Sequence, residues 1–280
     1  MLAPYEQRQI SLIRRWKARR PFVISKLIGL LLFPLTWLLN RLVPDAAIRA
    51  AFALSSYTGQ WLADTNDIKR DAGVTSLADL KNQELEKLDK IANGVRRWAI
   101  VLAAVEGAVT GAIGIFGLAF DTPSIVILSF RTIHKVGACY GFEVESPEDH
   151  EFIFAILATS SASSLQEKTA AIAELRAVQI ALKQTWKSMT KKAGEQVVGR
   201  EAGIIALKKF AAELGIKLTK RKALQAIPII GAVVGALVNS WYMYQVGWAA
   251  RRAFQERWLA ANGKIDAPIE PETAPVAQMT

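Results

Sequence analysis

Two long segments of the chain are almost devoid of charged residues and rich in small ones. Residues 99–120 contain one charged side chain, Glu106, and residues 227–250 contain none. Spacings of three and four residues place side chains on one side of a helix, where a glycine lets a second backbone come close. Glycines follow these spacings in both segments, at Gly107, Gly111, Gly114, Gly117, Gly231 and Gly235. We therefore predict that both segments are helices that pack on each other as a glycine-rich apolar hairpin.

Apolar residues recur at three- and four-residue steps through most of the remaining chain, which indicates amphipathic helices. Such helices are predicted over Pro44–Leu62, Ser76–Ile91, Pro123–Tyr140, Gln166–Met189 and Gly194–Leu214, with another starting at Ser146-Pro147. A helix junction is predicted at Asp121–Pro123, and Gly141 is a natural stop. No window shows the alternation typical of a strand. The predicted fold is an all-α multi-helix bundle around the hairpin core.

The first twenty residues are strongly basic. They carry six basic side chains against Glu6, with apolar residues at helical spacing, the pattern of a helix that lies on anionic lipid. The side chains assigned to this membrane surface are Arg14, Arg15, Trp16, Lys17, Arg19 and Arg20. A helix packed on its own domain is the alternative. The apolar segment Pro21–Leu39, interrupted by Pro34, is predicted to lie in the membrane plane or to re-enter it.

These patterns divide the chain into three regions. Residues 1–62 form the predicted membrane-associating helices, and a polar loop over Asp64–Gly73 joins them to a helical domain over residues 74–260. Residues 261–280 contain three prolines and little to bury, so they are predicted to be a disordered tail.

Composition narrows the classes of partner. The formal net charge is +10, which implies an anionic partner such as lipid head groups, nucleic acid or an acidic protein. No nucleic-acid-binding module is present, so we expect no nucleic acid. Cys139 is the single cysteine and only two histidines occur, which makes a zinc site improbable. The glycines lack the Gly-Lys-Ser/Thr of a phosphate-binding loop. We expect neither a metal nor a cofactor.

Polar residues embedded in the apolar segments are the candidates for a functional site. They are Glu106, Asp121, Arg131, His134, Tyr140 and Asn239. The favoured interpretation is structural: a few buried hydrogen bonds and an ion pair that fix the register of the helices. A pocket for a lipid or small ligand is the second interpretation, and acid–base chemistry by Asp121 and His134 is the third.

Two segments resemble the EcsC protein family of bacteria. The first runs from Gly107-Ala-x-Thr-Gly111 to Tyr140-Gly141-Phe142, and the second contains Ile227-Pro228, Gly231, Gly235, Asn239 and Tyr242. The resemblance covers roughly Leu77–Leu259 and leaves residues 1–62 outside it. The family is named after a product encoded beside an ABC-transporter ATPase and its membrane partner. The resemblance implies a membrane-associated, mostly helical protein, and it supplies no catalytic residues.

Three hypotheses for the function follow. The first is a non-enzymatic accessory protein on the cytoplasmic side of the membrane, peripheral or partly inserted. It would bind anionic lipid or a membrane complex such as an ABC transporter. The second is a protein whose apolar helical hairpin inserts into bilayers and perturbs them. The third is an enzyme acting on a lipid or its head group, for which Asp121 and His134 are the residues to test.

Overall fold

The computed structural model describes residues 2–19, 64–113, 117–144, 146–162, 165–189 and 228–272. Within these ranges the fold is all-α, with eight helices and no strand. The helices are α1 (Pro4–Ala18), α5 (Asn66–Ala72), the 3₁₀ helix η1 (Leu77–Asn82), α6 (Leu85–Ala112), α7 (Gly117–Cys139), α8 (Pro147–Ser161), α9 (Leu165–Met189) and α11 (Pro228–Ala261). The predicted segments Pro21–Leu39, Pro44–Leu62 and Gly194–Leu214 lie outside the described residues, as does Arg20.

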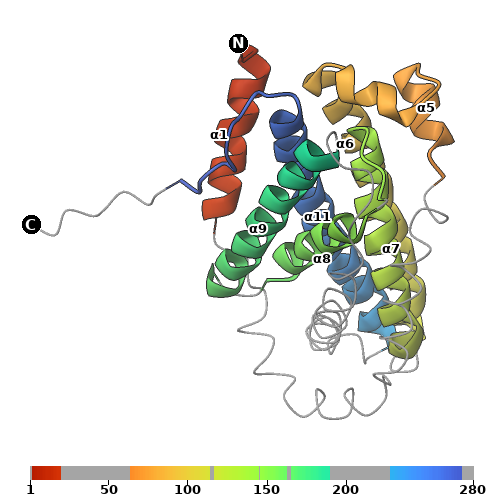
Figure 1. The fold of residues 1–280 in the computed structure, drawn as a ribbon. Helices are drawn as coiled ribbons and strands as arrows, with labels where there is room; N and C mark the ends of the chain where they lie inside the picture. Colours follow the sequence, from red (N-terminus) through yellow and green to blue (C-terminus); the bar gives the residue numbers. More distant parts are fainter. Residues whose placement is uncertain are drawn as a thin grey trace, which may run out of the picture.

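The long helix α11 organises the bundle. It packs along α6 and also contacts α7, α8 and α1. In Figure 1, α11 crosses the middle of the bundle, between α1 and α9 on the left and α6 and α7 on the right. Aromatic side chains fill the core where these helices meet: the rings of Phe152 and Phe254 lie edge to face at 5.2 Å, and those of Phe130 and Phe154 at 5.1 Å. Burial of such side chains dominates the stability of a core.

The predicted ends of two helices are confirmed. At the start of α8, the Ser146 hydroxyl accepts a 3.1 Å hydrogen bond from the Asp149 amide, and the Asp149 carboxylate accepts one from the Ser146 amide at 3.1 Å. These reciprocal bonds satisfy amide groups that have no partner within the helix. The preceding helix, α7, ends at Cys139, and Gly141 adopts a φ of 78° two residues later. That left-handed conformation suits glycine.

Several predicted boundaries are wrong. The single helix over Ser76–Ile91 is instead η1 followed by the start of α6, and the loop over Asp64–Gly73 contains α5. The helix over residues 99–120 does not exist as one rod, because α6 ends at Ala112 and α7 begins at Gly117. No junction occurs at Asp121–Pro123, which lies within α7. Gly111, Gly114 and Gly117 explain why the helix breaks before Asp121, since each glycine costs a helix about 1 kcal/mol relative to alanine.

The interruption changes where the glycines lie. Gly107 and Gly111 are buried in α6, whereas Gly117 begins α7, so the four glycines of this segment do not share one helix. Gly114 is outside the described residues, and the surroundings of Gly117 and Gly231 are not described. One close contact joins α6 to α11: a Cβ added at Gly107 would lie 2.3 Å from the carbonyl oxygen of Gly235. The two backbones therefore leave no room for a side chain at this point.

Residues 262–272, beyond α11, pack on the bundle, whereas this segment was predicted to be part of a disordered tail. This segment runs across α1 (Figure 1), and Ile269 is only 5% exposed. The Glu272 amide donates a 3.3 Å hydrogen bond to the Arg14 carbonyl, and the Arg176 guanidinium pairs with the Glu270 carboxylate. Ile269 supplies the apolar anchor that a proline-rich segment otherwise lacks.

Long apolar helices raise the question of a membrane span. None of the helices described, α6 and α11 included, is both long enough and apolar enough to cross a bilayer.

Candidate functional site

A buried polar network centres on Asp89 of α6. The apolar side of this helix carries Leu85, Leu88 and Ala92, all buried. Asp89 lies four residues after Leu85 and three before Ala92, so the helical repeat carries its carboxylate to the same side. The side chain is consequently inside the core, and Asp89 is 1% exposed. A carboxylate in such a position requires partners for all of its oxygen lone pairs.

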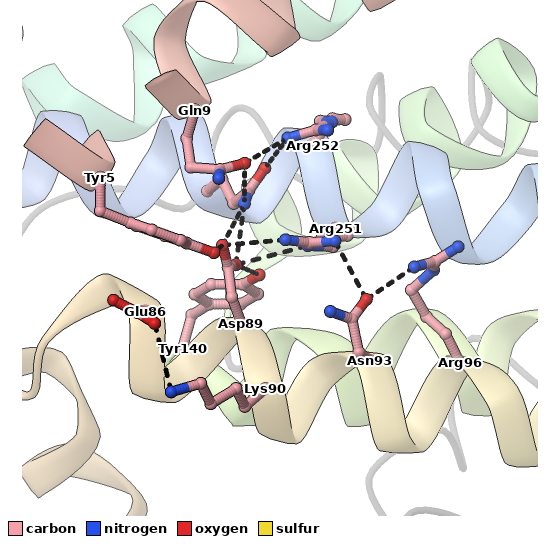
Figure 2. Close-up of polar contacts among 11 residues, drawn as sticks. Tyr5, Gln9, Glu86, Asp89, Lys90, Asn93, Arg96, Tyr140, Arg251 and Arg252 are labelled. Carbon is pink, nitrogen blue, oxygen red and sulfur yellow. Dashed lines mark hydrogen bonds and ion pairs between the residues drawn. The ribbon is translucent and has the colours of Figure 1, made fainter. Parts of the chain in front are cut away.

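Four donors from three other parts of the chain supply those partners (Figure 2). The Tyr5 hydroxyl of α1 donates to Asp89 Oδ2 at 2.6 Å, and the Tyr140 hydroxyl, just after α7, donates to Oδ1 at 2.5 Å. From α11, Arg251 Nη2 donates to Oδ2 at 3.0 Å, and Gln255 Nε2 lies 2.7 Å from the same oxygen. One carboxylate therefore ties together α1, α6, the end of α7 and α11.

Two further arginines join this network without an acidic partner. Arg96 Nη1 donates to Asn93 Oδ1 at 2.8 Å, and Arg252 Nη1 donates to Gln9 Oε1 at 2.8 Å. Arg251 also reaches Asn93 Oδ1, at 3.0 Å. All three arginines are buried, with exposures of 5–6%. Within the described ranges, the hydrogen bonds of Arg96 and Arg252 go only to neutral amide side chains.

The pKa values follow from this burial. Burial raises the pKa of both phenols, Tyr5 and Tyr140, and the adjacent Asp89 charge raises it further, so both stay protonated and remain donors. Burial, followed by repulsion from Arg251, lowers the pKa of Arg96 and of Arg252 to about 10. For Arg251, burial lowers the pKa. The hydrogen bond to Asp89 and the negative charge of that carboxylate raise it by more, so the pKa lies above its usual value. At neutral pH the network holds three cations and one anion.

A second buried ion pair lies between α1 and α11. Lys17 Nζ donates to Glu256 Oε1 at 2.8 Å and to the carbonyl of Ile269 at 2.8 Å, and the Ile269 amide donates to the same carboxylate oxygen at 2.6 Å. Both charged side chains are at most 2% exposed. This pair fixes α1 and the segment after α11 on the bundle.

These contacts correct part of the predicted membrane surface. Lys17 is committed to Glu256 and cannot reach a bilayer. Trp16 is half-buried, and the Lys168 ammonium group lies 5.1 Å from its ring. Among the members of the set that the structure describes, Arg14, Arg15 and Arg19 are exposed. The alternative interpretation, that this helix packs on its own domain, fits α1.

Of the five polar candidates whose side chains the structure describes, Tyr140 belongs to the Asp89 network. Asn239 is fully buried, with Nδ2 2.8 Å from where a Cβ at Gly107 would lie, and Glu106 is half-buried on α6. Arg131 is half-buried, and His134 is buried; both lie on α7.

Asp121 is also part of α7, although its side chain is not described. Thirteen residues separate Asp121 from His134, which corresponds to about 20 Å along one helix. The two residues that the enzyme hypothesis would test therefore cannot act as a direct acid–base pair.

His134 gives the structure a testable dependence on pH. Burial lowers the pKa of its imidazole from 6.5 to about 4, and His150 adds repulsion. In the unfolded chain the imidazole takes up its proton below about pH 6.5. Between these two pH values the unfolded state binds more protons, so lowering the pH favours unfolding. Stability should be fully present above pH 6.5 and fall toward pH 4. Denaturant titrations at pH 7 and 4.5 should show a smaller loss for His134→Leu than for the wild type, and equal losses would contradict this assignment.

Sequence reasoning missed the centre of the network. Asp89 lies within the apolar stripe of its helix, and this position was a readable signal that the carboxylate is buried. Arg251 and Arg252 directly follow the charge-free segment 227–250, and that local pattern does not identify their partners. Their pairing with Asp89 and Gln9 joins residues 162 and 243 positions apart, which no local pattern reports.

The site offers no obvious metal-binding or nucleophilic chemistry. Among the residues described, no three His, Cys, Asp or Glu side chains gather as metal ligands. Cys139 is fully buried, and burial raises the pKa of its thiol. A thiol held protonated is a poor nucleophile.

Comparisons with known proteins place the chain in a family. The EcsC protein family matches residues 7–259, so the match includes most of α1 and extends well beyond the predicted 77–259. The uncharacterized protein YdbA of Bacillus subtilis (strain 168) is 28% identical over 164 residues, which cover 59% of this chain and 55% of YdbA. Protein EcsC of the same organism is 25% identical over 158 residues, covering 56% and 58%. The matched region thus spans little more than half of each relative. No solved structure matches significantly. Because the family match covers most of the 280 residues of this chain, the chain belongs to the EcsC protein family.

Proposed function

We propose that this protein is a non-enzymatic accessory protein that binds the cytoplasmic face of a membrane through anionic lipid. The observation that carries the proposal is a row of exposed apolar side chains on α6, here called the α6 ridge. Its members are Trp98, Val101, Val105 and Val109 of α6 and Ile113, the residue that caps its C-terminus, and they are 49–63% exposed. Exposed apolar patches of this kind mark interaction surfaces for proteins or membranes.

Helix geometry makes the ridge continuous. Its members are three or four residues apart, so they lie on one side of α6 over about 22 Å. Val105 and Val109 are each two residues from Gly107, which places them about 200° around the helix from the glycine. Gly107 faces α11, and the ridge therefore faces away from it. Trp98 stands at one end, and tryptophan is favoured at the boundary between lipid and water.

The close contact between Gly107 and Gly235 supports a hairpin core built from α6 and α11. Gly107 and Gly235 let the two backbones touch, while Val233 and Leu237 of α11 are 63% and 64% exposed. Small residues inside and apolar residues outside suit a helix pair in contact with lipid, where close packing replaces the hydrophobic driving force. We include this glycine-rich hairpin in the proposal as the element that presents the apolar surface.

Charge favours anionic over neutral lipid. The chain carries a net charge of +10, and Arg14, Arg15 and Arg19 of α1 are exposed. Each basic residue near an anionic surface contributes on the order of 1 kcal/mol of attraction. A membrane complex such as an ABC transporter is a second class of partner that the same surfaces could engage.

Sedimentation with vesicles tests the proposal. We expect the wild type to bind vesicles of phosphatidylcholine and phosphatidylglycerol more strongly than vesicles of phosphatidylcholine alone. The double variant Val105→Asp/Val109→Asp should bind at least roughly tenfold more weakly, because it places two charges on the buried side of the contact. Ile180→Asp, on α9, where an apolar side chain is 46% exposed, is the control; its net charge matches that of the single variants Val105→Asp and Val109→Asp, which are measured beside it.

Two outcomes would overturn the proposal. One is a wild type that does not bind anionic vesicles. The other is a ridge variant that binds these vesicles as strongly as Ile180→Asp does. Release of a trapped dye at high occupancy would instead favour the bilayer-perturbing hairpin, which the outward apolar residues on both α6 and α11 also support.

A further inference from the structure

The three arginines of the buried network converge on one aromatic side chain, Trp248 of α11. The guanidinium carbons of Arg96, Arg251 and Arg252 lie 3.9, 5.1 and 4.8 Å from the centroid of its ring. The ring faces attract cations, but they do not neutralise them. Asp89 carries a single negative charge, so it cannot balance all three cations, and of the three it bonds only Arg251 among the contacts that the structure describes (Figure 2). The cluster is therefore rich in buried positive charge.

The same cluster contains unused hydrogen-bond donors. Arg96 Nε, Arg252 Nε and Trp248 Nε1 are buried, and none of them has a hydrogen-bond partner in the part of the chain that the structure describes. Buried donors of this kind are rare in folded proteins. Two buried guanidinium groups and an indole N–H suit an oxyanion, because guanidinium forms strong charge-assisted bonds to phosphate.

An apolar strip on α11 leads to this cluster. Val233, Leu237, Tyr244 and Trp248 follow steps of four, seven and four residues, so they share one side of the helix. Val233, Leu237 and Tyr244 are 44–64% exposed, and Trp248 is half-buried. The next position on the same side is Arg252, which is buried. An extended apolar surface that ends at unpaired cations matches a molecule with an apolar tail and an anionic head.

The ring of Tyr244, a member of this strip, contacts both Arg96 and Trp248. The Arg96 guanidinium lies 5.9 Å from the ring of Tyr244, and the rings of Tyr244 and Trp248 meet edge to face at 6.2 Å. Tyr244 is 44% exposed, so it can change rotamer without disturbing the core. Rotation of the Tyr244 ring away from Arg96 is therefore the movement that such a site requires.

We propose that Arg96, Arg252 and Trp248 bind the phosphate of an anionic phospholipid whose acyl chains lie along the Val233–Tyr244 strip of α11. The inference rests on the proposed function, because it names the lipid class and the residues that recognise it. It adds a specific site to the general attraction between a basic protein and a membrane. An anion there would balance the charge that Asp89 leaves uncompensated.

The test measures binding of a soluble, short-chain lipid to the full-length protein. Calorimetric titration with dihexanoyl phosphatidylglycerol, below the concentration at which it forms micelles, is compared with dihexanoyl phosphatidylcholine and inorganic phosphate. Arg96→Gln removes one cation of the site, and Arg97→Gln removes an exposed arginine next to it on α6, so their net charges match. We expect Arg96→Gln to weaken binding of the anionic lipid roughly tenfold or more and Arg97→Gln to leave it near the wild-type value.

A second variant keeps the test valid if Arg96→Gln fails to fold. Trp248→Phe retains an aromatic ring and removes only the indole N–H, and it should also weaken binding of the anionic lipid. Equal binding by the wild type, Arg96→Gln and Trp248→Phe would overturn the site. Inorganic phosphate that binds as well as the lipid would overturn the assignment to a lipid.

The two proposals can fail separately. If the wild type binds anionic vesicles and the site variants bind them and the short-chain lipid equally well, the site fails and the membrane function stands. If the short-chain lipid binds through Arg96 but vesicles do not bind at all, the membrane function fails and the headgroup site stands.

Discussion

Replacing Asp89 with asparagine is expected to lower the free energy of unfolding by about 3–5 kcal/mol, the range seen when one partner of a buried ion pair is removed. Asparagine has nearly the same shape, but it removes the charge that compensates Arg251, 3.0 Å away. It also turns an amide N–H₂ toward groups that donate to the carboxylate, among them the hydroxyls of Tyr5 and Tyr140. Denaturant unfolding followed by circular dichroism measures the effect.

Glu86→Gln is the matched control for this variant. Glu86 lies three residues before Asp89 on α6 and pairs with Lys90 at 3.2 Å, with its side chain 50% exposed. An exposed pair at this spacing contributes only about 0.3–0.5 kcal/mol. If Asp89→Asn proved no less stable than Glu86→Gln, the carboxylate would not be the centre of the network.

The second large effect is expected at the contact between α6 and α11. In Gly107→Ala the added methyl group would lie 2.3 Å from the Gly235 carbonyl oxygen and 2.6 Å from its carbonyl carbon. A backbone cannot rotate away as a side chain can, so the helices must separate. We expect a loss of about 3 kcal/mol or more in the free energy of unfolding, at the upper end of the range for overpacked cores.

Gly94→Ala provides a control of opposite sign on the same helix. Gly94 is exposed in the interior of α6, and an added Cβ there meets nothing within 4 Å. Alanine should raise the free energy of unfolding by about 0.5–1 kcal/mol through helix propensity alone. Thermal unfolding of the two variants compares them directly. Equal changes would show that the glycines matter only for backbone propensity and not for the close approach of α6 and α11.

Local chemistry predicted part of this fold well. Ser146, Pro147 and Asp149 identify the start of α8 because capping depends on neighbouring residues alone. The helices at Gln166–Met189 and over the last apolar segment were also expected, since their repeat is long and regular. The break after Ala112 was missed because glycine spacing indicates close packing and helix interruption equally well. Here it does both, because Gly107 packs on Gly235 and α6 ends at Ala112, one position after Gly111.

The candidate site was harder to predict because its residues are distant in sequence. Tyr5, Asp89, Tyr140 and Gln255 meet only once α1, α6, α7 and α11 are packed together. The apolar repeat around Asp89 does show that the carboxylate is buried, but it does not identify the partners. For the segment after α11, composition indicated disorder. Composition does not report that Ile269 is buried or that its backbone bonds to Lys17 and Glu256, and these contacts hold the segment in place.

The central claim, that the α6 ridge lies against anionic lipid, is tested most directly by a fluorescent label placed on the ridge. A cysteine at Val105 can carry an environment-sensitive dye, because the native Cys139 is fully buried and its thiol is held protonated. A second protein carries the dye at Ile180 on α9, which is exposed and lies outside the ridge. On vesicles containing phosphatidylglycerol, we expect a strong blue shift of the emission from position 105 and a much smaller one from position 180. Emission from position 105 that stays unchanged while the protein is bound would contradict it.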